Sequence, residues 1–492
     1  MLVLQLVLSL TVAFAQVIKP TLPSKDSFYE APSNVSDYDV GDIIDYRQAP
    51  YKLRSLYTEM DVKEAWQLLV RSEDSRGDPI AMVTTVLVPY DPNPSRVVSY
   101  QFAQDSATMD CAPSYHIARG ASMGTLVQQS ETLLVSGILA KGWYAVLPDY
   151  EGPDGAFTSG YQAGRAGLDS LKAALNSTEI TGISSDAKTA LWGFSGGSFA
   201  STWMASLQPE YAPELSDNLV GAALGGWVTN WTDVLAASEG RWFAGLVPNI
   251  LNGMIKADPD LKEIFDAEVK EEYQKRLYGG ADDCIFTAGV KYILKSFFEG
   301  ENPWFKSGYD FFDIPEIQAY AEKNVIGVHK ETPRPEIPLF VYHGVPDEIV
   351  PHAASYNAFK QFCEWGIKSL EYAESTTTGH ILEAIQGAGA ALAWIENRFN
   401  GEAPVDGCNH TVRTSNVLYP GADAQFHQLL RTIPVALTGQ EVGESTRNIT
   451  DSTMFTRIVQ NTVGGILGLV GPIPWKRDLT GVPDELAEMW QS

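Results

Sequence analysis

Short apolar runs alternate with helix-compatible stretches between residues 60 and 200. Several of these runs lack the apolar–polar alternation of a strand with one solvated face, which is typical of strands buried on both faces. Such strands with helices between them predict a mostly parallel sheet covered by helices on both sides. The clearest runs are Arg96–Phe102, Trp143–Pro148, Thr189–Gly193 and, further on, Pro338–His343.

This rhythm stops over residues 228–312. The segment is rich in Trp, Phe, Asp and helix-forming residues and holds no clear strand pattern. It lies between the strand-like residues 221–226 and 338–343, where a cap over the carboxyl edge of the sheet would be inserted, so we expect a helical cap. A strand-like run at 369–374 and a helical pattern over 381–399 follow it.

The patterns divide the chain into five predicted segments. The last of them, residues 401–492, contains a glycine-rich apolar stretch at 458–471 that is too polar and broken for a membrane helix. We expect this stretch to pack on the core or to form a flap beside an apolar substrate channel. The predicted segments are a signal peptide (1–15), a first part of the core (16–227), a helical cap (228–312), a second part of the core (313–400) and a C-terminal extension (401–492).

The start of the chain predicts a secreted, extracellular protein. Residues 1–15 form an apolar run that ends in Ala13-Phe14-Ala15, the small-x-small pattern that signal peptidase cleaves. Fifteen residues are too few to span a bilayer, so we expect no stable membrane insertion. Asn-x-Ser/Thr sequons, which fit passage through a glycosylating compartment, stand at Asn34, Asn176, Asn230, Asn409 and Asn448.

Charge and cysteine content narrow the possible partners. The formal net charge of −26 argues against nucleic acid, because neutralising phosphates requires clustered Lys and Arg. It also disfavours docking on anionic membranes. Four cysteines in an oxidising compartment permit two disulfides in any of three pairings, and none has C-x-x-C spacing, so stapling is expected and no metal site. They are Cys111, Cys284, Cys363 and Cys408.

A candidate nucleophile lies in the run Gly193-Phe194-Ser195-Gly196-Gly197. A serine on a sharp strand-to-helix turn needs small neighbours so that the strained backbone can approach adjoining elements. The strand-like run 189–193 precedes Ser195 and a helix-compatible run follows it, which is the arrangement that this pattern requires. We therefore predict that Ser195 is the catalytic nucleophile of a serine hydrolase with the α/β-hydrolase fold.

A serine hydroxyl needs a base to take its proton and an acid to orient that base. In α/β-hydrolases the chain order is Ser, then Asp or Glu, then His. The loop after the strand at 338–343 places Asp347 at a carboxyl end, and we predict that Asp347 is the acid. Its nearest competitor is Glu348, one residue further on.

Seven histidines are available as the base. We predict His380, which stands in the loop after the strand-like run 369–374 and heads a helical stretch. His343 ends a strand and is expected to be structural. His329 and His352 also precede or lie too near the acid loop. The alternatives that follow Asp347 in the chain are His410 and His427, and neither follows an evident strand.

The tetrahedral oxyanion needs two backbone donors. One is expected from Gly196, the residue after the nucleophile, and the other from the loop after an early strand. That loop begins Ala103-Gln104-Asp105-Ser106 and lacks the HGGG pattern of many lipases. Spacing alone does not choose between Gln104 and Asp105.

With these residues assembled, the chain resembles the fungal secretory lipases over roughly residues 40–410. Beyond that range it runs on past the family's usual end. The runs that carry the resemblance are Tyr100-Gln101 with Asp105-Ser106, Asp110-Cys111-Ala112-Pro113-Ser114, Pro148-Asp149-Tyr150-Glu151-Gly152-Pro153, Gly193–Gly197, His343-Gly344 with Asp347, and Gly379-His380.

The resemblance implies a Ser195–Asp347–His380 triad and an oxyanion hole from Asp105 and Gly196. It also implies a helical cap at about 228–312, the pairings Cys111–Cys284 and Cys363–Cys408, and no metal or organic cofactor. The implied activity is hydrolysis of acylglycerol esters, with a lipid or other ester as the partner and an oil–water interface as a possible place of action.

Two other functions stay open at this point. The same family includes fungal esterases that remove acetyl groups from secondary metabolites, and kinship of fold fixes the reaction better than the substrate. From another class, the chain is compatible with a non-catalytic binding protein on a hydrolase scaffold. Such proteins usually lose a triad member, whereas this chain retains all three predicted residues.

Overall fold

The computed structural model describes residues 19–55, 58–437 and 441–443. All of them belong to one compact unit. The predicted signal peptide (1–15), the sequon at Asn448 and the apolar stretch at 458–471 lie outside the described residues.

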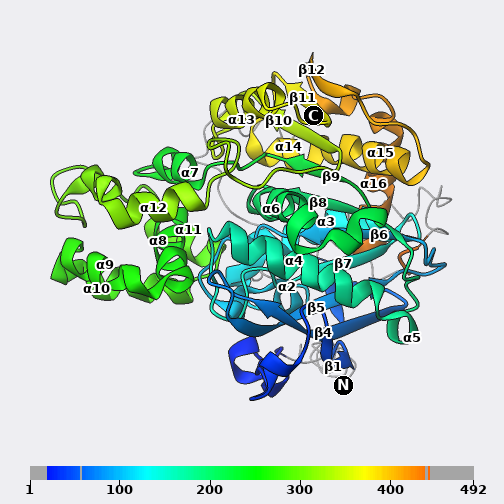
Figure 1. The fold of residues 1–492 in the computed structure, drawn as a ribbon, viewed down its shortest axis with the longest axis horizontal. Helices are drawn as coiled ribbons and strands as arrows, with labels where there is room; N and C mark the ends of the chain where they lie inside the picture. The colour runs from blue at the N-terminus through cyan, green and yellow to red at the C-terminus, as the bar shows by residue number, and fades with distance from the viewer. Residues whose placement is uncertain (1–18, 56–57, 438–440, 444–492) are drawn as a thin grey trace, which may run out of the picture. The chain divides into compact units, whose positions relative to one another are not determined.

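Within the described residues, a ten-stranded sheet runs in the order β1-β4-β5-β7-β6-β8-β9-β10-β11-β12 (Figure 1). Neighbours from β1 to β7 pair antiparallel, and all neighbours from β7 to β12 pair parallel. The short strands β2 (Leu53–Ser55) and β3 (Thr58–Met60) pair separately. The strands of the main sheet are β1 (Ile43–Gln48), β4 (Glu64–Glu73), β5 (Pro79–Val88), β6 (Arg96–Gln101), β7 (Tyr144–Pro148), β8 (Lys188–Phe194), β9 (Leu219–Gly225), β10 (Leu339–Gly344), β11 (Ser369–Ser375) and β12 (Gly407–Arg413).

Helices cover both faces of this sheet. Val97 of β6 lies in one apolar cluster with Leu168 of α4 and Met204 of α6, whereas its neighbour Val98 lies in a second cluster with Ile138 of α3. Successive residues of one strand are therefore buried on opposite faces, which is why the run lacks polar positions. The helices of the core are α2 (Pro113–His116), α3 (Leu126–Leu139), α4 (Gly160–Leu175), α5 (Thr178–Thr181), α6 (Gly196–Tyr211), α13 (His352–Glu364), α14 (His380–Gln386), α15 (Ala388–Phe399) and α16 (Ala422–Leu437).

The chain between β9 and β10 forms a helical insertion, defined here as residues 226–338. Figure 1 shows its helices α8 to α12 beside one another at one side of the view. Aromatic side chains fill its interior, among them Trp304, which stacks on Tyr273 with ring centroids 5.0 Å apart. Its helices are α7 (Trp231–Ser238), α8 (Leu246–Ala257), α9 (Lys262–Glu268), α10 (Glu271–Tyr278), α11 (Ile285–Tyr292) and α12 (Pro315–Lys323).

Three features differ from the sequence-based expectation. The boundary at residue 312 marks no change of structure, because α12 continues the helical insertion to Lys323. The helical pattern at 381–399 is two helices, α14 and α15, separated at Gly387. The boundary at residue 400 is wrong, because β12 pairs with β11 in the same sheet. β12 is a partly exposed edge strand with mostly polar residues, so its sequence holds no apolar run that would predict a strand.

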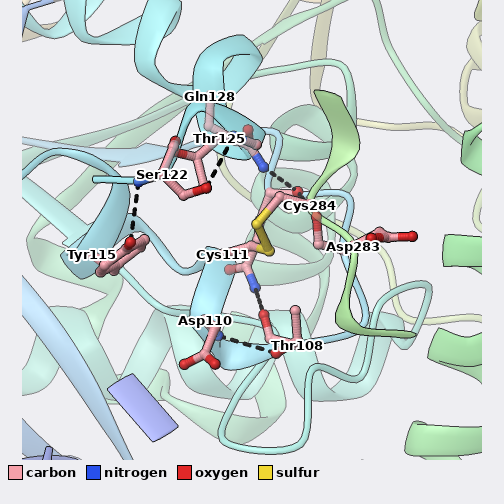
Figure 2. The surroundings of a disulfide bond; sticks show 12 residues. Thr108, Asp110, Cys111, Tyr115, Ser122, Thr125, Gln128, Asp283 and Cys284 are labelled. Atoms are coloured by element: carbon pink, nitrogen blue, oxygen red, sulfur yellow. Dashed lines mark hydrogen bonds between the residues drawn. A yellow bond between two sulfur atoms is a disulfide. The ribbon is translucent and has the colours of Figure 1, made fainter. Parts of the chain in front are cut away.

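Two disulfides tie distant segments together. Cys111 and Cys284 are linked across 173 residues, and Figure 2 shows this bond joining the segment around Thr108 and Asp110 to the residues that precede α11. Gly124, close by, packs against the insertion as well, since a Cβ at Gly124 would lie 2.6 Å from Thr287 Oγ1. The second disulfide, Cys363–Cys408, joins α13 to the edge strand β12.

Candidate active site

Ser195 lies at the turn between β8 and α6. Its backbone has φ 55° and ψ −126°, a conformation that non-glycine residues rarely adopt. The Ser195 amide donates to the carbonyl of Gly225 at 2.9 Å, which anchors the turn to the neighbouring strand β9. The strained turn thus projects a serine from the carboxyl end of a central strand, as the nucleophile of an α/β-hydrolase requires.

Two glycines make room for this turn. A Cβ at Gly193 would lie 2.1 Å from the carbonyl oxygen of Gly197, and a Cβ at Gly197 would lie 1.9 Å from the carbonyl oxygen of Gln101 on β6. Real Cβ atoms do not approach backbone oxygens this closely. The small residues on either side of Ser195 are therefore required by backbone contacts between β6, β8 and α6.

The ring of His380 bridges Ser195 and Asp347. His380 Nε2 lies 2.9 Å from Ser195 Oγ, and His380 Nδ1 lies 2.7 Å from Asp347 Oδ2. Phe194 packs against the imidazole with ring centroids 4.8 Å apart. Gly226 leaves room for both rings, since a Cβ there would lie 2.7 Å from His380 Cε1 and 3.0 Å from Phe194 Cζ. The three predicted triad residues therefore meet in one hydrogen-bonded chain.

The carboxylate of Asp347 is buried and fully hydrogen-bonded. Its Oδ1 accepts from the amides of Ile349 at 2.9 Å and Val350 at 2.7 Å. Burial alone would raise the pKa of Asp347, but the facing imidazole of His380 and hydrogen bonds from His343 and His380 hold it below its usual range. Asp347 therefore stays ionised and orients the His380 ring.

The competing acid and bases lie elsewhere. Glu348 accepts from the backbone amide of His380 at 2.8 Å, so it holds the start of α14, whereas the ring nitrogen Nδ1 is bound by Asp347. Among the later histidines, His410 binds Glu374 at 3.1 Å. The exposed His427 lies 3.4 Å from Asp423. Neither of these two contacts is with Ser195.

Asp105 lies directly beside Gly196, the second oxyanion candidate. A Cβ at Gly196 would lie 1.9 Å from Asp105 Oδ1, so the carboxyl occupies the space next to that glycine. The Asp105 backbone has φ 47°. The amide of Gln104 donates to the carbonyl of Phe102 at 2.9 Å. The choice of Asp105 as the second donor stays a prediction from the family resemblance.

Buried partners fix the loop that carries Asp105. Asn249 of α8 donates from Nδ2 to the Asp105 carbonyl at 2.7 Å, so the helical insertion contributes directly to this loop. The amides of Asp105 and Ser106 face the carboxyl of Glu151, whose pKa burial raises well above its usual value. Burial also raises the pKa of Asp105 to about 7, against the opposing effect of His380.

The predicted disulfides and sequons have the following positions. The structure forms Cys111–Cys284 and Cys363–Cys408, the pairings that the resemblance implied. Asn34, Asn176 and Asn409 are exposed. Asn230 is partly buried, and its side-chain oxygen caps α7 by accepting from the Thr232 amide.

The described residues hold no group of three or more His, Cys, Asp and Glu side chains placed to bind a metal ion. Among the described helices, none has both the length and the apolar character needed to cross a bilayer.

Sequence reasoning missed the supporting residues around the triad. Asn249 lies 144 positions from Asp105 in the chain, within a segment expected only to form a cap. His343, expected to be structural, lies 3.3 Å from Asp347 through its Nε2. The sequence signal for the contact between His343 and Asp347 was that His343 ends a predicted strand four residues before Asp347.

Comparison with known proteins places the chain in a family. The family model described as secretory lipase matches residues 117–407. Lipase 1 of Candida albicans is 44% identical over 435 residues, which cover 88% of this chain and 93% of that protein. Lipase A of Arthroderma benhamiae is 33% identical over 87% of this chain and 90% of that protein.

A solved structure supports the same kinship. The X-ray structure of Candida antarctica lipase A superimposes with a TM-score of 0.74 at 27% identity, covering 84% of this chain and 95% of that one. The α/β-hydrolase fold predicted from the sequence is thereby confirmed. On the family match, the identities and the shared fold together, the chain belongs to the secretory lipase family.

Proposed function

We propose that this chain is a secreted enzyme that hydrolyses acylglycerol esters through an acyl-enzyme on Ser195. The observation that carries the proposal is the hydrogen-bonded chain from Ser195 Oγ through His380 to Asp347, with distances of 2.9 and 2.7 Å. Hydrolysis of carboxylic esters is the activity of the family to which the chain belongs. Secretion is supported by the signal-like residues 1–15, and sequencing of the mature N-terminus should give Gln16 first.

The chemistry proceeds in two steps at these residues. Ser195 Oγ attacks the ester carbonyl carbon while His380 Nε2 takes its proton, and Asp347 stabilises the imidazolium that forms. The amides of Gly196 and Asp105 stabilise the oxyanion of the tetrahedral intermediate. His380 then returns the proton to the leaving alcohol, and the acyl group stays on Ser195. A water molecule, deprotonated by His380, reverses these steps and releases the carboxylic acid.

An exposed apolar surface supports a lipid substrate. We define the α14 face as Ile381, Leu382 and Ile385, whose exposed fractions are 57%, 54% and 45%. These residues follow His380 directly, so the face lies at the catalytic histidine. The only acidic or basic side chain on α14 besides His380 is the buried Glu383. An uncharged apolar surface in a chain of net charge −26 fits an uncharged oil phase better than an anionic membrane.

The experiment is a chain-length series of esters assayed above and below their solubility limits. We expect higher rates on emulsified long-chain acylglycerols than on dissolved short-chain esters. Ser195→Ala should abolish turnover, while the control Ser130→Ala, at an exposed serine of α3, should retain it. Turnover that survives Ser195→Ala would overturn the mechanism. Activity confined to dissolved acetyl esters would instead assign the chain to small-molecule esterases.

A second pair of variants tests the surface. Exchanging Ile381 and Ile385 for Ser should lower the rate on emulsions and leave the rate on dissolved esters unchanged. Val328→Ser is a matched control, because Val328 is an apolar residue of similar exposure, 48%, outside α14. Equal emulsion rates for all three proteins would remove the assigned role of the α14 face.

A further inference from the structure

The acid of the candidate triad contacts two imidazole rings. Asp347 Oδ2 lies 2.7 Å from His380 Nδ1 and 3.3 Å from His343 Nε2. The side chains of Asp347 and His343 both have an exposed fraction of 0%. His343 stands in β10, the strand that leads into the acid loop, and its polar ring is buried only because each nitrogen finds a partner.

The hydrogen bonds of His343 determine which nitrogen carries its proton. The Trp227 amide donates to His343 Nδ1 at 3.0 Å, so Nδ1 must present a lone pair. In the neutral ring the proton is then on Nε2, which faces Asp347 Oδ2 and, at 3.2 Å, the carbonyl of Val350. The Nε2 proton of His343 is therefore shared between the Val350 carbonyl and Asp347 Oδ2, at 3.2 and 3.3 Å, on the side of the ring opposite to Trp227.

We propose that His343 is a positioning residue of the esterase reaction, which donates a hydrogen bond to Asp347 and thereby sets how strongly this carboxylate holds His380. The inference rests on the proposed Ser195–His380–Asp347 mechanism. Two donors share Oδ2, so each receives part of its negative charge. The carboxylate is held in the rotation that aims Oδ2 at His380, while Oδ1 is occupied by backbone amides.

Other ionisable groups face His343 without replacing this contact. The ring of His352 lies 5.7 Å away between centroids in an edge-to-face arrangement. The carboxyl of Glu383 also faces the ring, and its own hydrogen bonds go to Thr378 and Asn416. Asp347 is thus the carboxylate to which His343 Nε2 is bound.

Two substitutions test the two nitrogens of the His343 ring separately. In His343→Asn the side-chain oxygen takes the place of Nδ1 and keeps an acceptor for Trp227, but no donor reaches Asp347. In His343→Gln the amide nitrogen takes the place of Nε2 and keeps the donor to Asp347, while the acceptor is lost. Both variants replace the imidazole by an amide of similar polarity. They differ in whether the new side chain donates to Asp347.

We expect His343→Asn to lower kcat about 10- to 100-fold with little change in KM, as loss of a hydrogen bond to a charged group would. Its acidic limb in the pH–rate profile should move to higher pH, because the undivided charge of Asp347 then binds the His380 proton more tightly. His343→Gln should keep kcat within about threefold and leave the limb in place. Equal kcat values for both variants, or a greater loss in His343→Gln, would overturn the proposal.

A measurement on the wild-type protein needs no variant to fold. In nitrogen-15 NMR of labelled histidines, the ring assigned to His343 should be protonated at Nε2 and not at Nδ1, whereas the His380 ring donates to Asp347 from Nδ1. A His343 ring protonated at Nδ1 would also overturn the proposal. The triad itself is tested separately by Ser195→Ala. Residual turnover in that variant would remove the proposed mechanism. An inactive Ser195→Ala protein, together with a lower kcat in His343→Asn than in His343→Gln, supports both the mechanism and the role of His343.

Discussion

Asp347 and Glu348, consecutive in the chain, bind different parts of the same residue: Asp347 holds the ring of His380 at 2.7 Å and Glu348 holds its backbone amide at 2.8 Å. Glu348 thus supplies an acceptor at the first residue of α14, where a helix has unpaired amides. Residues that compete for one role in the sequence have two complementary roles in the structure.

Replacing each of these two acids by its amide should lower kcat to unequal extents. Asp347→Asn should lower kcat by about 10³- to 10⁴-fold, because an amide no longer stabilises the imidazolium or selects the ring tautomer. Glu348→Gln keeps an oxygen that can accept from the His380 amide, so we expect a loss of less than about tenfold. Steady-state kinetics on a dissolved ester measures both. A larger loss in Glu348→Gln would reassign the acid.

Asp105 should produce an alkaline limit to activity. Burial raises the pKa of its carboxyl to about 7, and the ionised group would stand beside Gly196, where the oxyanion develops. We therefore expect kcat/KM to fall above about pH 7. Asp105→Asn keeps the backbone amide and tolerates the positive φ, but its side chain does not ionise. That variant should retain activity to about pH 9, and an unchanged alkaline limb would contradict the assignment.

Buried carboxyls should make the fold more stable in acid than in mild base. In the unfolded chain they ionise near pH 4, whereas burial keeps them protonated in the folded chain to higher pH. Folding therefore retains protons that unfolding releases, and the free energy of unfolding should fall as pH rises from about 4 to 8. The residues concerned are Asp105, Asp149 and Asp169, with pKa values raised to about 7, and Glu131, raised to about 8.

Urea unfolding at about pH 5 and pH 8 measures this dependence. Each such carboxyl contributes a slope of about 1.4 kcal/mol per pH unit between its two pKa values. Glu131→Gln should reduce the slope of the free energy of unfolding against pH by the contribution of one carboxyl. Glu301→Gln, at an exposed glutamate, is the control and should leave the slope unchanged. A protein that is more stable at the higher pH would show that these carboxyls are ionised in the folded state.

Gly197 should not tolerate a side chain. In Gly197→Ala the added carbon would lie 1.9 Å from the Gln101 carbonyl oxygen, so the turn at Ser195 would have to move. We expect loss of activity and a lowered melting temperature. Gly289 of α11 has no atom within 4 Å of an added Cβ, so Gly289→Ala should be neutral or stabilising by up to about 1 kcal/mol. Thermal unfolding of the two variants gives the comparison, and an active, stable Gly197→Ala protein would refute the steric account.

The residues that sequence reasoning reached share a local signal. Ser195 and Asp347 each follow an apolar strand, and the order of serine, acid and histidine is set by the fold. Asn249 offers no such signal, because its contact with Asp105 depends on how the helical insertion packs on the core. The strand β12 was missed for a different reason: an edge strand needs no apolar run, since one side of it faces solvent. Long-range packing therefore decides what the local pattern leaves open.

The Cys111–Cys284 bond gives the helical insertion a third attachment beside its two chain ends. Cys111 follows Asp105 by six positions, and Asn249 binds the Asp105 carbonyl from the same insertion. The start of α11 is in this way bonded covalently to a segment six residues along the chain from Asp105. A displacement of the insertion relative to the core is therefore most restricted at this bond, which protects the position of the loop that carries Asp105.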